Sequence, residues 1–338
     1  MIMNWKKLLR IVLFAALALV LLYFSFRGIK WNNFVEGLKT ANYFWIFMSI
    51  VVGAISFYVR AARWRIMLLG FGKPVKRLDT FDGVGMAYLT NFALPRAGEI
   101  ARCGVIAGRT GLGFDKVIGS VVAERSFDVL CLLVITIAVA ILRIDVFGNF
   151  MITQIWEPFI HSLGGSTWLA IALCLGLPAL LILFVYFFRA PLLKLNITHK
   201  ILGFLKGIWK GLVDSIKMPR KGYFFFLTAL MWFLYVCTSY CTILATPLRD
   251  QFDFTDALFL MVVGSFGWVV PVQGGIGAFH FILSLALVAV YGLTQTSGMV
   301  FATISHESQA VTMLMTGLFA VIHLSIARKK NKTKPEIQ

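Results

Sequence analysis

The sequence predicts an all-α protein, a polytopic transmembrane helical bundle with six to eight crossings and with broken or re-entrant helices. Of its 338 residues, 59% are hydrophobic and only 14% are charged, which is more apolar material than a soluble domain of this size buries. Apolar runs of about 17 to 25 residues recur along the chain, and one such run spans the bilayer core as a helix. Because the runs are too continuous for the alternating strands of a β-barrel, helices are the predicted spanning elements.

Six continuous apolar runs are the predicted spans, and two less regular stretches lie at residues 81–94 and 257–291. The first run has the basic flank of a signal peptide, but no small-residue cleavage site follows Phe26, so we expect a retained helix. If both irregular stretches return to their own side there are about six crossings, and if the second crosses twice there are about eight. The six runs are residues 8–26, 43–59, 117–142, 168–188, 223–245 and 299–327.

The net charge is +17, and the distribution of the charged residues along the chain indicates the topology. Basic residues gather at the N-terminus and in segments 60–77, 189–221 and 328–334, and acidic segments lie between them. This is the positive-inside pattern, so we expect a protein of the cytoplasmic membrane with both termini in the cytoplasm. The basic segments are expected to contact anionic lipid headgroups. Without an aromatic–basic motif, nucleic acid is not an expected partner.

Five cysteines lie mostly within apolar runs. Cys237 and Cys241 share a helix face, but there is no CxxC pair and no histidine at ligand spacing. We therefore expect the cysteines to fill helix packing, and we predict neither a metal nor another cofactor.

Two apolar stretches are interrupted in the same way. Aligned on Pro95 and Pro271, both read apolar-Pro-x-x-Gly-x-Ile-small. Proline removes a backbone donor and ends a helix, and glycine permits the reversal that follows. Non-helical backbone at membrane depth is tolerated only beside protein or a wet cavity, and paired interruptions indicate an inverted repeat around a central site. The alternative is a chance match over a short window.

Ionisable residues within the spans are candidate functional groups, because each is costly in lipid. Glu124 and Asp128 are four apart and share a helix face, so they need a cation, which Arg96 or Arg102 can supply. The other predicted ion pair joins the neighbouring Arg125 to Glu99 in the first break. The alternative is that such pairs only hold helices in register.

Two further polar groups have less specific interpretations. Glu307, beside His306, is predicted either to contact a proton or headgroup or to mark a polar helix end. Arg60, Arg63 and Arg65 close the second span, and together with Trp64 they are predicted to anchor it at the headgroup level. Residues 200–217 have the spacing of an interfacial amphipathic helix.

Four motifs combine intramembrane charges with helix breakers: Arg63-Trp64, Pro95-Arg96-Ala97-Gly98-Glu99 with Arg102, Glu124-Arg125 with Asp128, and Pro271 with Gly274-Gly275-Ile276-Gly277. Together they resemble the lysylphosphatidylglycerol synthase transmembrane-region family, also called flippase-like domain proteins, over nearly the whole chain. In fused members of that family the membrane region moves an aminoacylated phospholipid, and a separate cytoplasmic domain makes it. The resemblance implies one flippase-like domain at residues 1–327 and a basic cytoplasmic tail at 328–338, without the synthase domain.

The predicted function is therefore translocation of a phosphate-bearing lipid, a phospholipid or a lipid-linked intermediate, without catalytic residues. No GxxxxGK[ST] motif occurs, so transport is expected to be passive or ion-coupled. Two alternatives stay open: a non-catalytic scaffold for an envelope-biosynthesis enzyme, and a membrane enzyme acting on a lipid-linked substrate. The predicted substrate-binding residues are Asn91, Pro95, Arg96, Gly98, Glu99, Arg102, Glu124, Arg125, Asp128, Gly274, Gly275 and Glu307.

Overall fold

The computed structural model describes residues 5–94, 96–144, 156–169 and 220–332, and single positions at 152, 171, 172, 176 and 183. Every regular element in these residues is a helix, which confirms the predicted fold class. Five of the described helices are long and apolar enough to cross a membrane, or six if a bent pair counts as one span. The chain is thus an integral, multi-pass membrane protein.

Five of the six predicted continuous spans each coincide with a described helix. These helices are α1 (Trp5–Phe26), α3 (Tyr43–Leu69), α6 (Phe114–Leu142), α12 (Lys221–Ala245) and α15 (Gln295–Lys332). The predicted span at residues 168–188 and the amphipathic helix at 200–217 lie largely or wholly outside the described residues. The assignment of residues 1–327 to a single domain and the six or eight crossings stay predictions.

The chain divides into two compact units. The first comprises Met1–Arg125 with Ser215–Gln338, and the second comprises Ser126–Asp214. Helix α6 begins in the first unit and continues into the second, which also contains the short α8 (Glu157–Ser162). The polar clusters described below lie within the first unit.

A sharp bend follows α1, and the sequence did not predict it. The axes of α1 and the nine-residue α2 (Trp31–Lys39) differ by 94°. Phe26, at the end of α1, stacks on Trp31 and meets the ring of Phe34 edge-on. This aromatic contact stabilises the angle between the two helices.

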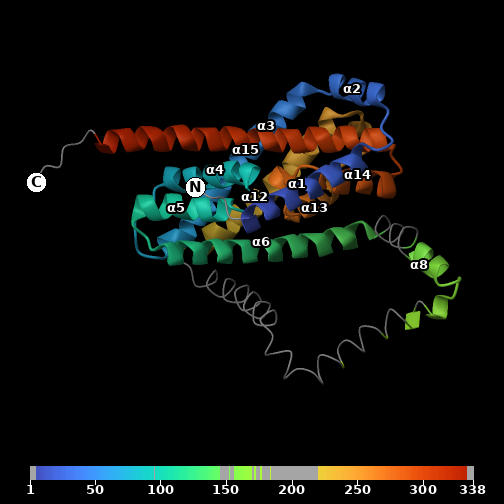
Figure 1. Cartoon of the computed structure of the whole chain (residues 1–338), viewed down its shortest axis with the longest axis horizontal. Coiled ribbons are helices and arrows are strands. Elements are labelled where there is room, and N and C mark those ends of the chain that lie inside the picture. The colour runs from blue at the N-terminus through green and yellow to red at the C-terminus, as the bar shows by residue number, and fades with distance from the viewer. Residues whose placement is uncertain are drawn as a thin grey trace, which may run out of the picture. The chain divides into compact units, whose positions relative to one another are not determined.

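Within the first unit, α15 is a long helix that packs against α4 (Arg77–Ala93), α14 (Ala278–Tyr291) and α3, and α3 packs along α12 (Figure 1). Met299 and Ile304 of α15 are buried in one apolar cluster with Phe34 of α2 and Ala245 of α12. The last helix of the chain therefore contacts elements from both ends of the sequence.

Side-chain hydrogen bonds cap the N-termini of α3 and of the helix that precedes the second break. Asn42 accepts a hydrogen bond from the Phe44 N–H at the start of α3. Asp253 and Asp256 form a capping box at the start of α13 (Phe254–Val269). The hydrogen bond from the Thr255 hydroxyl lowers the pKa of Asp253, which keeps this cap ionised.

Both predicted interruptions are breaks between helices. Helix α4 ends at Ala93, and α5 (Gly98–Thr110) begins five residues later. Helix α13 ends at Val269, and α14 begins at Ala278 after the short 3₁₀ helix η3 (Gln273–Gly275). Pro95 itself lies outside the described residues. The inverted repeat and the sides from which the two breaks enter stay predictions.

Candidate functional site

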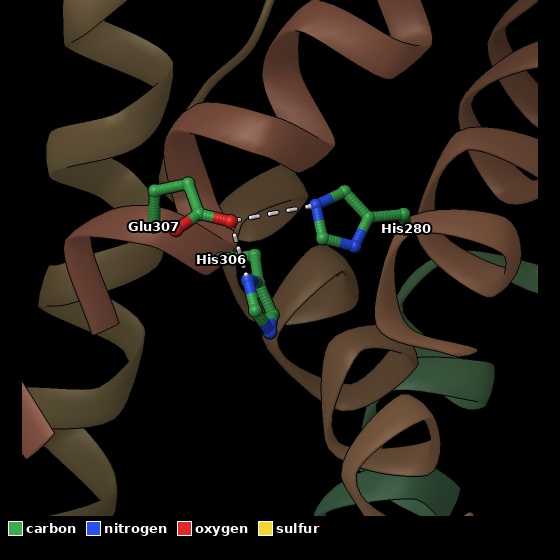
Figure 2. A group of neighbouring side chains, drawn as sticks. All are labelled: His280, His306 and Glu307. Carbon is green, nitrogen blue, oxygen red and sulfur yellow. Dashed lines mark hydrogen bonds and ion pairs between the residues drawn. The ribbon is translucent and has the colours of Figure 1, made fainter. Parts of the chain in front are cut away.

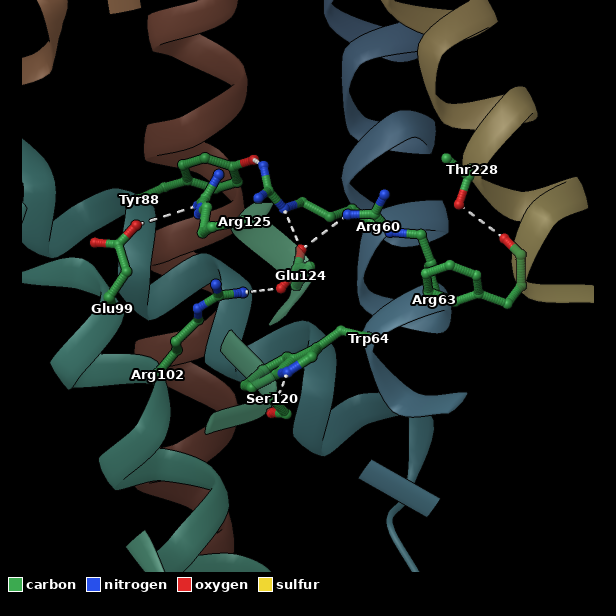
Figure 3. Close-up of polar contacts among 11 residues, drawn as sticks. Arg60, Arg63, Trp64, Tyr88, Glu99, Arg102, Ser120, Glu124, Arg125 and Thr228 are labelled. Atoms are coloured by element: carbon green, nitrogen blue, oxygen red, sulfur yellow. Dashed lines mark hydrogen bonds and ion pairs between the residues drawn. The ribbon is translucent and has the colours of Figure 1, made fainter. Parts of the chain in front are cut away.

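Glu124 on α6 is completely buried and is held by three arginines (Figure 3). On α3, Arg60 Nε and Arg63 Nη2 lie 3.2 and 3.1 Å from Glu124 Oε1. On α5, Arg102 Nη1 lies 2.6 Å from Oε2. One carboxylate therefore joins three helices through charge-assisted hydrogen bonds. We call these four residues the arginine cluster.

Aromatic side chains surround the arginine cluster. The guanidinium of Arg102 lies over the Trp64 ring, 4.7 Å from its centroid, and the Trp64 indole N–H donates to Ser120 Oγ at 3.0 Å. Arg60 Nη1 donates to the Tyr88 hydroxyl at 3.1 Å. Cation–π contact and hydroxyl acceptors lower the cost of removing the guanidiniums from water.

The arginine cluster is rich in buried positive charge. Its three guanidinium groups carry three positive charges, and Glu124 supplies one negative charge. The side chains of Arg63 and Arg102 are 0% and 1% exposed, and that of Arg60 is 9% exposed. A buried group of this charge favours an anion, and planar guanidiniums match the oxygens of a phosphate. The arrangement can thus bind an anionic headgroup once the carboxylate makes room.

The predicted headgroup anchoring of Arg60, Arg63 and Trp64 is wrong. Trp64 is 0% exposed, and both arginines point into the protein toward Glu124. The physical reason is that α3 continues to Leu69, well beyond the predicted end at residue 59, so these residues lie inside the helix and face α5 and α6 instead of the helix end. Only Arg65 stays near a loop, where its Nε donates to the Val75 carbonyl.

The predicted ion pairs are partly resolved by the structure. Arg125 Nη2 lies 3.2 Å from Glu99 Oε1, so that predicted pair is confirmed. Arg102, rather than Arg96, supplies the cation for Glu124. Asp128 is half-buried one turn further along α6, in the second unit. Residues of α5 and α6 form both the arginine cluster and the Glu99–Arg125 pair, whereas α3 contributes to the arginine cluster alone.

The first break is closed by a side-chain hydrogen bond. Asn91 Oδ1, on the last turns of α4, accepts from the Gly98 N–H at 2.8 Å, at the start of α5. A Cβ at Gly98 would collide with the Ala87 carbonyl and with the Asn91 amide. Gly98 is thus required because α4 and α5 approach too closely for any side chain, and this contact positions Arg102 one turn later.

Replacing Gly98 with alanine is expected to lower the free energy of unfolding by about 1–3 kcal/mol through overpacking. The measurement is reversible unfolding of the purified protein in mixed micelles. The matched control is Gly104→Ala in the same helix, where an added Cβ meets nothing within 4 Å. That change should be neutral or stabilising by about 0.5–1 kcal/mol. Equal destabilisation by both variants would contradict the close approach at Gly98.

The two breaks lie against each other. Arg96, with a left-handed φ of 62°, donates from Nη2 to the Val269 carbonyl at 2.6 Å, at the end of α13. Gly274, with φ 55°, lies so close to the Phe92 ring that a Cβ would be 2.7 Å from it. Arg96 therefore joins the second break rather than the arginine cluster. The packing of one break on the other supports their interpretation as related parts of one site.

Glu307 takes part in a different cluster. It lies on α15 and contacts His306 on the same helix and His280 on α14 (Figure 2). The predicted residue Gly275 lies against the Trp268 ring beside this second cluster. Apart from Pro95, the predicted residues are thus divided between helices α4, α5 and α6 and the region of the second break with α15.

Sequence reasoning missed several buried polar residues as candidates. Arg60 and Arg63 were assigned to anchoring, although their spacing of three places both on one helix face, a signal for a common partner. Two buried aspartates of α4 also went unnoticed. Asp79 pairs with Arg109 at 2.9 Å, and Asp82 with His323 at 2.6 Å.

A pocket of about 420 Å³ lies elsewhere in the first unit. None of its lining residues belongs to the arginine cluster, which is packed shut in this conformation. The pocket is lined by Phe24, Arg27, Phe281, Ser284, Leu285 and Gln295.

Comparison with known proteins identifies one family. The model of the lysylphosphatidylglycerol synthase TM region matches residues 8–317, nearly the whole chain. A search of curated proteins and a search of solved structures gave no match.

Proposed function

This chain belongs to the lysylphosphatidylglycerol synthase transmembrane-region family, and we propose that it moves a phosphate-bearing lipid between the leaflets of the cytoplasmic membrane. The family connects the chain to membrane lipids. The observation that carries the proposal is the arginine cluster, in which three buried guanidiniums meet at the Glu124 carboxylate. In this proposal the chain is a transporter rather than an enzyme, and both termini lie in the cytoplasm.

The lipid phosphate binds where Glu124 now lies. Arg102 and Arg60 approach the carboxylate from different helices, so a phosphate between them receives hydrogen bonds from two directions. Bidentate guanidinium contacts suit phosphate oxygens, whereas the acyl chains remain in the hydrocarbon. Because the cluster is closed, Glu124 holds the arginines together until a headgroup replaces it, which limits leakage of ions.

The two breaks allow the site to open. Helix α5 carries Arg102 and begins directly at the first break, which contacts the second break through Arg96 and Val269. Backbone at a break lacks the continuous hydrogen bonds of a helix, so rotation there costs less than bending a span. Movement at the paired breaks therefore separates Arg102 from the arginines of α3.

The test is lipid movement in reconstituted vesicles. Wild-type protein is expected to move phosphatidylglycerol carrying a fluorescent acyl chain, measured by quenching of the outer leaflet with dithionite. Arg102→Gln is expected to slow this movement at least about tenfold, because it removes a charged hydrogen bond of about 1.5–3 kcal/mol. The matched control is Arg109→Gln on the same helix, where the arginine pairs with Asp79 outside the cluster. It should move lipid nearly as fast as wild type.

Two further arms make the result decisive. Arg60→Gln, which changes the most exposed arginine of the cluster, repeats the test if Arg102→Gln fails to fold. A fluorescent glucosylceramide, which lacks phosphate, should not be moved. Movement of phosphatidylglycerol by folded Arg102→Gln or Arg60→Gln protein at the wild-type rate would rule out the proposed phosphate site.

A further inference from the structure

We infer that His280, His306 and Glu307 form a binding site for a divalent transition-metal ion of the zinc class. The three residues come from α14 and α15, and their ligand atoms all lie within 4.8 Å of one another (Figure 2). The inference rests on these residues alone and does not depend on lipid translocation.

The spacing of the three ligand atoms suits one small ion. His306 Nδ1 lies 3.0 Å and His280 Nε2 lies 3.9 Å from the same oxygen, Glu307 Oε1. Ligands of a tetrahedral zinc ion, with bonds of about 2.0–2.1 Å, lie about 3.4 Å apart. All three atoms lie within 4.8 Å of one another, so side-chain shifts of about 1 Å or less bring them into coordination.

The hydrogen bonds of His306 leave one nitrogen for the ion. Its Nε2 lies 2.9 Å from the Gly274 carbonyl oxygen, which can only accept, so Nε2 carries the proton. The other ring nitrogen, Nδ1, lies 3.0 Å from the Glu307 carboxylate oxygen. Both atoms become ligands when a metal ion takes the place of a proton between them. A backbone carbonyl that orients the ring through its other N–H is the usual outer partner of a metal-bound histidine.

His280 supplies the third ligand. It is 4% exposed, and its Nδ1 has no hydrogen-bond partner in the part of the chain that the structure describes. Its other nitrogen, Nε2, faces Glu307 Oε1 at 3.9 Å, which is longer than a hydrogen bond. A buried imidazole with poorly satisfied nitrogens is costly, and an ion that binds Nε2 offsets part of this cost.

The surroundings leave one side of the site open. The Trp268 ring stacks on His306 with centroids 5.5 Å apart and planes 15° apart, and the Phe279 ring lies at the same centroid distance. By contrast, the Glu307 side chain is 59% exposed. Two imidazoles and one carboxylate are a zinc ligand set that leaves the fourth position for water or a ligand oxygen. The bound ion would tie α14 to α15 and, through Gly274, to the second break.

The test uses Co²⁺ and Zn²⁺ on the purified, chelator-treated protein, prepared without a histidine tag. Wild-type protein is expected to bind one Co²⁺ with the strong visible absorption of a tetrahedral site, and Zn²⁺ should displace it. His280→Gln and Glu307→Gln should each weaken Zn²⁺ binding by about 100-fold or more, since even outer partners cost 10- to 100-fold. His323→Gln, which changes a histidine paired with Asp82, should bind as wild type does.

Three results would overturn the inference. They are the absence of the tetrahedral Co²⁺ spectrum in wild-type protein, unchanged Zn²⁺ affinity in folded Glu307→Gln, or an equal loss in His323→Gln. Glu307→Gln is the decisive variant because its exposed side chain tolerates substitution. Lipid movement is not part of this readout, so its outcome is independent of the translocation test.

Discussion

Replacing Glu124 with glutamine is expected to lower the free energy of unfolding by about 3–5 kcal/mol, the cost of breaking a buried ion pair from one side. The carboxylate is completely buried, and its loss leaves Arg60, Arg63 and Arg102 facing one another. Their mutual repulsion in a low-dielectric interior adds to the lost hydrogen bonds. Reversible unfolding in mixed micelles measures the change.

The matched control for this variant is Glu99→Gln. Glu99 also pairs with an arginine, Arg125, but the two side chains are 31% and 42% exposed. Exposed pairs contribute about 1 kcal/mol or less, so this change should be small. Similar losses for Glu124→Gln and Glu99→Gln would show that the burial of Glu124 does not determine its contribution.

Replacing Trp64 with alanine is expected to lower the free energy of unfolding by about 3–5 kcal/mol, because it opens a large cavity in the protein interior. The indole is 0% exposed, it stacks on Arg102, and it donates to Ser120. Trp64→Phe keeps most of the volume and should lose roughly 1 kcal/mol with the indole hydrogen bond. The same unfolding measurement separates the two contributions.

Trp31→Ala provides the contrast with Trp64. Trp31 is 58% exposed at the start of α2, where its ring stacks on Phe26. Its removal should cost about 1 kcal/mol, the value of one aromatic contact. If Trp64→Ala were as mild as Trp31→Ala, Trp64 would be an interfacial anchor after all, and the burial found in the structure would be contradicted.

The two polar clusters have a common plan. Each combines one carboxylate with nitrogen-bearing side chains, at least one of which comes from another helix, and each lies next to a break. The arginine cluster includes α5, which begins at the first break, and His306 bonds the carbonyl of Gly274 in the second. At the breaks, neighbouring segments approach closely and backbone groups are available for side-chain hydrogen bonds, while the clusters carry the charged groups.

Much of the architecture follows from the sequence. Apolar run length predicts the long helices, and proline with glycine predicts both breaks, because these effects depend on residues close together in the chain. The pairing of Arg125 with Glu99 could also be predicted, since few other charges lie within the spans. The absence of a metal site was predicted only from local spacing, which does not test ligands on separate helices.

The tertiary structure decided which faces of the helices meet. Arg60, Arg63 and Trp64 read as interfacial residues by position alone, and only the packing of α3 with α5 and α6 directs them toward Glu124. His280 and His306 likewise meet because α14 and α15 pack side by side. The sequence by itself determined where the long apolar helices lie and where they break, through local hydrophobicity and backbone chemistry. The partners of its buried charges depend on helix rotation, which is set by contacts between residues distant in the chain.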